Sequence, residues 1–327
     1  MASNINFLDF EKQLDLFEDR GMVVSNREKA LVKLETIGYY KIKEFSYPLA
    51  LSEDPLSFDN VNFNDIVTRY YQDKNLRIYL LHAIEKIEVS IKTRLSYVIG
   101  KKYGAFGYLN FSNWYQIDKS IDMKQAISNR KRDESKFKDD LKAKVSRSSS
   151  IDINKECNLE NGFPSIWLAV DVLTFGDIVF MLKNMTNKNL REIADFYDCS
   201  NSELKSWMSC LNFVRNMCAH NSNVIDIRFK TTPVLKDEWK KHLYVYPNRK
   251  EYTNRVATAI YIVLHFVNKI NPVYRFDTIT TSLSSIVKNN DAMAQTLGFK
   301  NAEQFKKSLP MKKQRKKSYQ HKKKLKR

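Results

Sequence analysis

The longest periodic pattern in the chain, Phe63 to Gly100, places the strongest constraint on the fold. Within it, apolar side chains recur every three or four residues, which is the spacing of one helix face: Leu76, Leu80, Ala83, Ile84, Ile87, Ile91 and Leu95. Charged side chains, among them Glu85 and Glu88, occupy the other side. We therefore predict one long amphipathic helix here, with its charged side facing solvent.

Shorter patterns on both sides are also helical. Only 8 Gly and 7 Pro occur in 327 residues, which favours helices over turn-rich sheets. Ser25 and Ser202 are the expected N-caps of two of these helices, and Pro164 is expected in the first turn of a helix that continues through Leu182. With 43% hydrophobic residues the chain can bury a core, so we predict an all-α globular fold.

Composition shifts divide the chain into four parts. We predict an N-terminal helical segment over 1–62 and a helical domain over 63–275, with a polar insertion at about 116–161. Small helices over 276–309 follow. A basic tail over 310–327 ends the chain, and we expect this tail to be disordered without a partner.

The net charge points to a polyanionic partner. The chain carries 55 Lys and Arg against 37 Asp and Glu, a formal charge of +18, and 10 of the basic residues lie in the last 16 positions. Without those positions the charge is still +8. Such an excess favours nucleic acid first and an anionic membrane second. A tail that serves only to keep the protein in solution is the alternative.

Several classes of protein are not expected. The four cysteines form no CxxC pair, and no cluster of metal-ligand residues is visible, so we predict neither a metal nor a cofactor. The longest strongly apolar uncharged stretch, 256–268, is shorter than the ~20 residues that cross a bilayer. It contains His265, which we expect to be packed in the core. No signal peptide is apparent, so a cytoplasmic protein without membrane association is expected.

The stretch LNFVRNMCAHNS, Leu211 to Ser222, carries the candidate chemistry. Four residues separate Arg215 from His220, and Asn216 lies four before His220, so a helix places Asn216 and His220 on one face with Arg215 at its edge. A guanidinium matches a phosphodiester, and an imidazole exchanges protons near neutral pH. By itself the spacing can arise by chance, and a histidine at a helix end is often a cap.

Basic residues elsewhere are candidate RNA contacts. Lys41 and Lys43 lie in an aromatic run that could stack on bases or could be the edge of a packed core. Lys92 and Arg94 lie on the polar side of the long helix, where Glu85 or Glu88 could orient the Arg or the His of the motif. The tail adds Lys312, Lys313, Arg315, Lys316, Lys317, Lys322, Lys323 and Lys324.

Four segments, in this order, resemble the Abi-like abortive-infection proteins of the AbiD/AbiF type. They are FEKQLDLFEDRGM…KALVKLETIGYYKIKEFSYPL, YYQDKNLRIYLLHAIEKIEVSIKTRL, FPSIWLAVDVLTFGDIVFML and VRNMCAHNS, which together cover most of residues 7–270. The resemblance implies a HEPN-type helical bundle whose Arg, Asn and His signature corresponds to Arg215, Asn216 and His220. It also implies a homodimer with a composite RNA-cleaving site, and a possible structured noncoding RNA as antitoxin.

The sequence departs from that family after the histidine. Residues 221–226, NSNVID, lack the Arg that relatives often carry and end in Asp226. The departure concerns a phosphate contact beside the motif, and it leaves the acid–base pair in place.

The resulting hypothesis is a bacterial phage-defence or toxin–antitoxin protein that binds RNA and cleaves it without a metal. His220 would transfer protons, Arg215 would stabilise charge on the phosphorane, and Asn216 would orient His220 or bind phosphate. A non-catalytic RNA-binding protein that uses the same basic surface is the first alternative. A membrane-surface toxin is the second, and the lack of an apolar face beside the tail argues against it.

Overall fold

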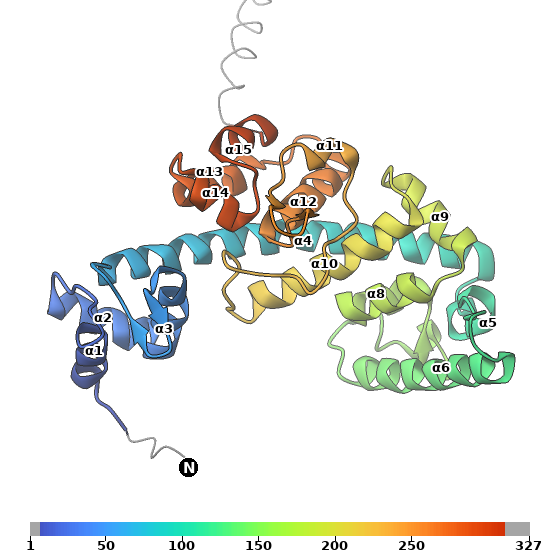
Figure 1. The fold of residues 1–327 in the computed structure, drawn as a ribbon. Coiled ribbons are helices and arrows are strands. Elements are labelled where there is room, and N and C mark those ends of the chain that lie inside the picture. The colour runs from blue at the N-terminus through green and yellow to red at the C-terminus, as the bar shows by residue number, and fades with distance from the viewer. Residues whose placement is uncertain (1–6, 311–327) are drawn as a thin grey trace, which may run out of the picture.

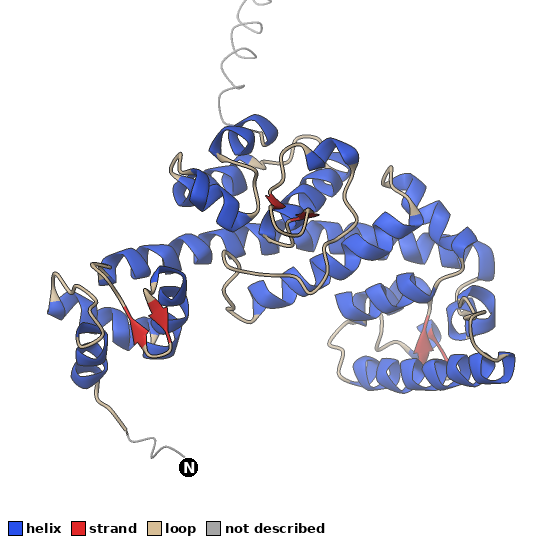
Figure 2. Cartoon of the chain, viewed as in Figure 1, coloured by secondary structure: helices blue, strands red, loops and turns tan. Residues whose placement is uncertain are grey.

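The structure, a computed structural model, describes residues 7–310, and these residues form an all-α fold as predicted. Helices account for nearly all of the regular structure, and the strands are short (Figure 2). The tail beyond Pro310 lies outside the described residues. The prediction that it is disordered, and the proposed RNA contacts from Lys312 to Lys324, therefore stay predictions.

The first part of the chain forms three helices and then the long one. Their bounds are α1 Phe10–Glu18, α2 Arg27–Ile37, α3 Tyr39–Ser46 and α4 Phe63–Tyr103. The middle part contains α5 Phe111–Trp114, α6 Met123–Ser146, α7 Ile166–Val172, α8 Phe175–Asn184, α9 Asn187–Phe196 and α10 Asn201–Ala219. The last part contains α11 Asp237–Lys240, α12 Val256–Ile270, α13 Asp277–Val287, α14 Asp291–Leu297 and α15 Ala302–Ser308.

Short 3-10 helices and two-stranded antiparallel hairpins complete residues 7–310. The 3-10 helices are η1 Tyr47–Leu49, η2 Gly107–Leu109 and η3 Glu156–Asn158. The strands are β1 Ser52–Glu53 with β2 Leu56–Ser57, β3 Leu159–Glu160 with β4 Phe163–Pro164, and β5 Val245–Tyr246 with β6 Glu251–Tyr252.

The long helix α4 is the axis of the molecule. It has 41 residues, and Figure 1 shows it running the length of the fold, with α1–α3 at one end and α5–α9 around the other. Helices α7, α10, α12 and α13 all pack against it. The predicted helix over 63–100 is confirmed. It continues to Tyr103 and is capped by Gly104, whose positive φ of 78° suits a residue without a side chain.

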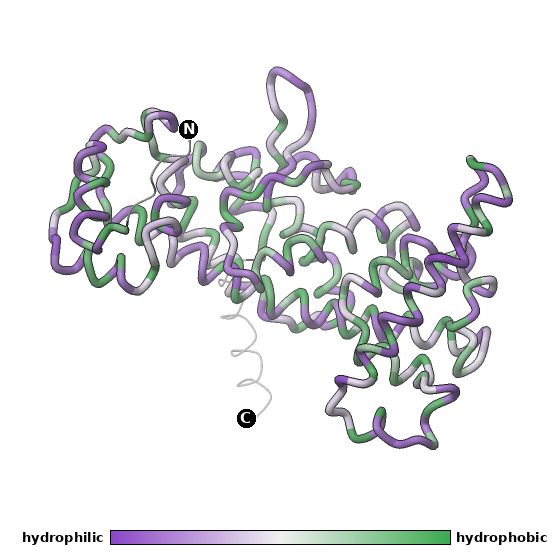
Figure 3. The backbone as a smooth tube through the Cα atoms, turned by 90° about the horizontal axis from the view of Figure 1, so that it is seen from below, coloured by the Kyte–Doolittle hydropathy of each residue, from purple (hydrophilic) through white to green (hydrophobic). Residues whose placement is uncertain are grey.

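Two hydrophobic cores lie along α4. The smaller one contains Leu14, Phe17 and Phe45 together with Phe63 and Ile66 from the start of α4. The larger one begins at Leu76 and includes the buried faces of α7–α10 and α12–α15. In Figure 3 green and purple positions alternate along the helical tubes, because each helix turns one apolar face toward these cores. The boundaries predicted between the parts of the chain stay predictions.

Two predicted helix caps are wrong by one or two residues. Asn26, rather than Ser25, caps α2 by accepting a hydrogen bond from the amide of Lys29, while Ser25 Oγ accepts one from Asn62. Ser200, rather than Ser202, caps α10, and it forms a reciprocal capping box with Glu203. In both cases a competing polar side chain nearby has the geometry that the cap requires.

The helix predicted from Pro164 through Leu182 is also wrong, because it is two helices. Pro164 belongs to β4, α7 ends at Val172, and α8 begins at Phe175. Thr174 starts α8 with a capping box in which the Asp177 side chain accepts from the Thr174 amide. The apolar character of both helices hides this break, since hydrophobic periodicity continues across it.

His265 is half-buried and packs against buried aromatic residues at the edge of the larger core. Its Nε2 donates to the carbonyl of Tyr197 at 2.7 Å, and its ring lies 4.9 Å from that of Trp207. Burial lowers the pKa of His265, because a charged imidazolium is poorly solvated there.

We therefore predict a pH-dependent stability. The pKa of His265 is lower in the folded state than in the unfolded state. Neutral His265 therefore contributes to the free energy of unfolding above the unfolded pKa of about 6.5, and this contribution is lost as pH falls below that value. Thermal melts at pH 7.5 and 5.5 should show a smaller loss for His265→Gln, which retains a donor for Tyr197 and cannot ionise, than for wild type. Equal losses in both proteins would contradict this assignment.

Candidate active site

Helix α10 presents the motif at its C-terminal end. Its buried face packs Leu204, Trp207, Leu211 and other apolar residues into the larger core. Asn216 and His220 are consequently exposed. Arg215 is half-buried at the edge of the same face, and its Nη1 donates to Asn216 Oδ1 at 3.3 Å. Asn216 and His220 thus both lie on the solvent-facing side of α10, with Arg215 beside Asn216.

The chain turns sharply directly after His220. Asn221 takes a left-handed conformation with φ 57°, its amide donates to Cys218 O at 3.4 Å, and the amide of Ser222 donates to Met217 O at 2.9 Å. These two bonds form a Schellman motif, which ends a helix at a defined residue. Asparagine is among the few residues that adopt this conformation at low cost. The turn therefore fixes where His220 sits at the end of α10.

A buried carboxylate on α4 holds the chain that follows this turn. Asp73 is fully buried and accepts hydrogen bonds from the amides of Val224, at 2.7 Å, and Ile225, at 2.9 Å. It also accepts from Arg77 Nε at 2.6 Å. Burial raises the pKa of Asp73, and these three hydrogen bonds act in the opposite direction. Each carboxylate interaction therefore compensates part of the cost of burying the charge.

Side chains on either side of Asp73 complete the contact, which we call the α4 clamp: Arg69, Asp73 and Arg77 on α4 with residues 221–226. Arg77 Nη1 donates to Asn221 Oδ1, and Arg69 forms an ion pair with Asp226. The three α4 residues are spaced by four, so they lie along one face of the helix. The clamp thus connects the first half of α4 to the loop that follows the motif helix.

Within the loop, the Asp226 carboxylate has two partners. Asn223 Nδ2 donates to Asp226 Oδ2 at 2.8 Å, and the Asp226 amide donates to Asn223 Oδ1 at 3.1 Å. Arg69 neutralises the carboxylate. Asp226 therefore serves to dock the loop on α4, and its negative charge is not left free beside the motif.

The other predicted RNA contacts lie in different environments. Lys41 Nζ donates to the carbonyl of Asn221 at 3.0 Å, so the structure brings Lys41 to the end of the motif. Lys43 lies over the ring of Tyr47 at 5.8 Å. Lys92 pairs with Glu88 at 2.9 Å, and the Arg94 guanidinium lies 3.6 Å from the centre of the Phe196 ring.

Lys92 is fifteen residues beyond Arg77 along α4, or about 22 Å at 1.5 Å per residue. Neither Lys92 nor Arg94 belongs to the motif's surroundings, and any RNA contact they make stays a prediction. The α4 carboxylate that reaches the motif's end is Asp73, whereas the two glutamates considered from sequence lie farther along the helix.

The clamp residues were not found from sequence, although a signal was present. Asp73 lies three residues before Leu76, so extending the apolar stripe of α4 backward places Asp73 on the core side. Arg69 and Arg77, four residues before and after Asp73, have the spacing of ordinary ion pairs on a helix surface, so their spacing gave no sign of a buried contact. A charge at a core position was the feature that should have singled out Asp73.

Within residues 7–310, no group of three or more His, Cys, Asp or Glu side chains is placed to hold an ion. Burial raises the pKa of the Cys199 and Cys218 thiols to about 12, so both are protonated at neutral pH. In the same range of residues, no helix has the length and apolar character needed to cross a membrane.

A family model described as Abi-like protein matches residues 32–226, which are 195 of the 327 residues. The chain belongs to the Abi-like protein family. The expected abortive-infection family is thereby confirmed, while the HEPN type stays a prediction. No curated protein and no solved structure matches the chain.

The matched region of this Abi-like protein begins within α2 and ends at Asp226. It therefore contains the whole of α4, the motif of α10 and the loop that the clamp holds. Helices α12–α15, which complete the larger core, lie beyond it.

We predict that the clamp is essential for stability. Asp73→Asn keeps the shape of the side chain but leaves Arg77 as a buried charge without its carboxylate, a loss that costs about 3–5 kcal/mol in the free energy of unfolding. Glu85→Gln, on an exposed position of the same helix, changes the charge equally and should cost less than about 0.5 kcal/mol. Urea denaturation of both variants measures the difference, and equal midpoints would contradict the prediction.

Proposed function

We propose that this Abi-like protein is an RNA-binding toxin of a phage-defence or toxin–antitoxin system, and that it is a metal-independent endoribonuclease. The observation that carries the proposal is the exposure of Asn216 and His220 at the end of α10, with the half-buried Arg215 beside Asn216 and the buried clamp holding the loop that follows. A rigid support under exposed polar groups is what a preorganised catalytic site needs.

The proposed reaction uses the ribose of the substrate as nucleophile. The 2′-oxygen attacks the adjacent phosphorus while His220 accepts its proton, and the bond from phosphorus to the 5′-oxygen breaks as that oxygen receives a proton. Arg215 stabilises the negative charge on the phosphorane oxygens, and Asn216 orients His220 or binds a phosphate oxygen. The products are a 2′,3′-cyclic phosphate and a 5′-hydroxyl end.

The reaction needs one group that accepts a proton and another that donates one, and two histidines can fill these two roles. We propose a homodimer in which the motifs of two chains meet, so that one His220 accepts the proton of the 2′-hydroxyl and the other donates to the leaving oxygen. A structured noncoding RNA bound to the basic surface would restrain this activity. Both features follow from the resemblance of the motif to the HEPN pattern.

We predict that His220→Ala and Arg215→Ala each lower RNA cleavage about 100-fold or more, since they remove the proton-transfer group and the charge-stabilising group. The measurement is sequencing of new 5′-hydroxyl RNA ends in bacteria that express each variant at equal level, together with growth. Arg132→Ala, an exposed arginine on α6, is the matched control and should behave as wild type.

The contrary result is also specific. Growth inhibition without new 5′-hydroxyl ends, or growth inhibition that persists in both variants, would support the non-catalytic RNA-binding alternative. In that case Arg215 and His220 would be phosphate contacts only.

A further inference from the structure

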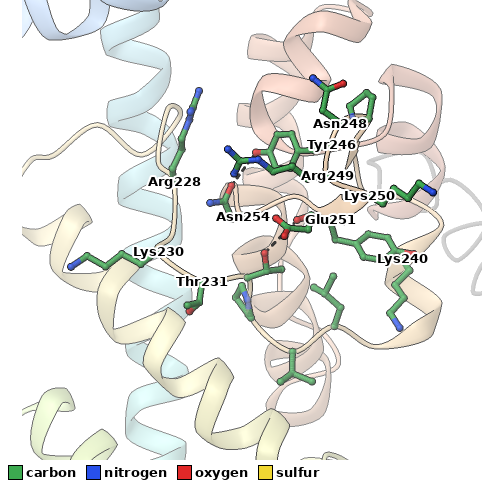
Figure 4. Close-up of a pocket in the computed structure, with 16 residues that line it drawn as sticks. Arg228, Lys230, Thr231, Lys240, Tyr246, Asn248, Arg249, Lys250, Glu251 and Asn254 are labelled. Carbon is green, nitrogen blue, oxygen red and sulfur yellow. Dashed lines mark hydrogen bonds between the residues drawn. The ribbon is translucent and has the colours of Figure 1, made fainter.

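A basic cavity lies between the chain after the clamp and the β5–β6 hairpin. It encloses about 960 Å³ and is bounded by residues 228–235 on one side and residues 246–254 on the other (Figure 4). Five basic side chains line it, namely Arg228, Lys230, Lys240, Arg249 and Lys250, against one carboxylate, Glu251. The cavity therefore has a strong excess of positive charge.

Most of this charge is not neutralised within the protein. Lys240 pairs with Asp237 at 2.6 Å. Arg228, Lys230, Arg249 and Lys250 are all exposed, and over residues 7–310 none of these four has a carboxylate within ion-pair distance. Like charges held around one cavity repel, so an anion that enters it gains attraction from several cations at once.

Hydrogen bonds hold the two sides of the cavity in position. Asn254 Nδ2 donates to the carbonyl of Phe229 at 2.7 Å, and Tyr246 Oη donates to Asn254 Oδ1 at 3.0 Å. Thr232 Oγ1 adds a bond to the carbonyl of Tyr252 at 3.3 Å. The hairpin is thus fixed to the segment that follows Asp226, and the cations are presented on a framework that need not reorganise on binding.

A second cavity extends the first toward the motif. It encloses about 640 Å³ and shares Arg228, Lys230, Thr231 and Pro233 with the first, so the two adjoin. Lys183 and Phe213 line it as well. Phe213 is 43% exposed and lies seven residues before His220, on the same side of α10 and about 10 Å from it along the axis.

We propose that these two cavities form one basic groove that binds the phosphate backbone of a single RNA strand and leads it along α10 to the motif. The inference rests on the proposed RNA-directed function. A compact anion would need only one of the cavities, whereas an extended polyanion uses the cations of both. Phe213 offers a base-stacking surface between the cavities and His220, which suits a single strand.

Binding of RNA to full-length protein that carries His220→Ala tests the groove. The probe is a fluorescein-labelled oligouridylate of about 20 nucleotides, followed by anisotropy over a series of salt concentrations. Adding Lys230→Ala and Arg249→Ala should weaken binding about 10-fold or more. It should also reduce the slope of log K against log salt by about 1.4, because two phosphate contacts are lost at about 0.7 each.

The matched control adds Lys131→Ala and Lys136→Ala, two exposed lysines on α6, which remove the same charge away from the groove. It should stay within about twofold of the His220→Ala parent. Equal affinities and slopes for the groove variant and the control variant would overturn the groove. Uridine monophosphate that binds as tightly as the oligomer would also overturn it, because the cavities would then be a site for a small anion.

These outcomes are separable from those of the proposed nuclease. The binding assay uses protein without His220, so it needs no cleavage. Loss of binding in the groove variant together with an inactive wild type would retain the groove and reject the nuclease.

Discussion

The carboxylate of Asp73 is the contact on which the arrangement of the site depends. It lies fully buried in the first half of α4 and accepts hydrogen bonds from two backbone amides of the chain after α10 and from the Nε of Arg77. A buried charge is tolerated only when such partners compensate the lost hydration. Its position therefore ties the longest helix to the end of the motif helix.

Through this contact, α4 both packs against the two hydrophobic cores and holds the loop that follows the motif. Before the clamp, Phe63 and Ile66 bury in the smaller core, and after it the stripe from Leu76 buries in the larger one. Arg69, Asp73 and Arg77 lie on this helix where the smaller core ends and the larger one begins. The break between two apolar cores is thus the place where α4 contacts the loop that follows His220, and Lys41 of α3 reaches the same loop.

Periodicity predicted the helices well and the polar contacts poorly. The apolar stripe of α4 and the exposed face of Asn216 and His220 followed from spacing within one helix. The clamp joins residues about 150 positions apart, and the pairing of Asp73 with the amides of residues 224 and 225 has no local signature. The break at Thr174 was missed because a capping box, not a change in hydrophobicity, separates α7 from α8.

The most direct test of the proposed chemistry uses purified wild-type protein, a single-stranded RNA that it cuts, and a copy in which the nucleotide before the cut carries a 2′-deoxyribose. Both are incubated with EDTA, and the ends are identified by mass spectrometry. The account predicts a 2′,3′-cyclic phosphate and a 5′-hydroxyl from the RNA, and no cut at the deoxyribose. Cleavage at the deoxyribose, or a 3′-hydroxyl end, would contradict it.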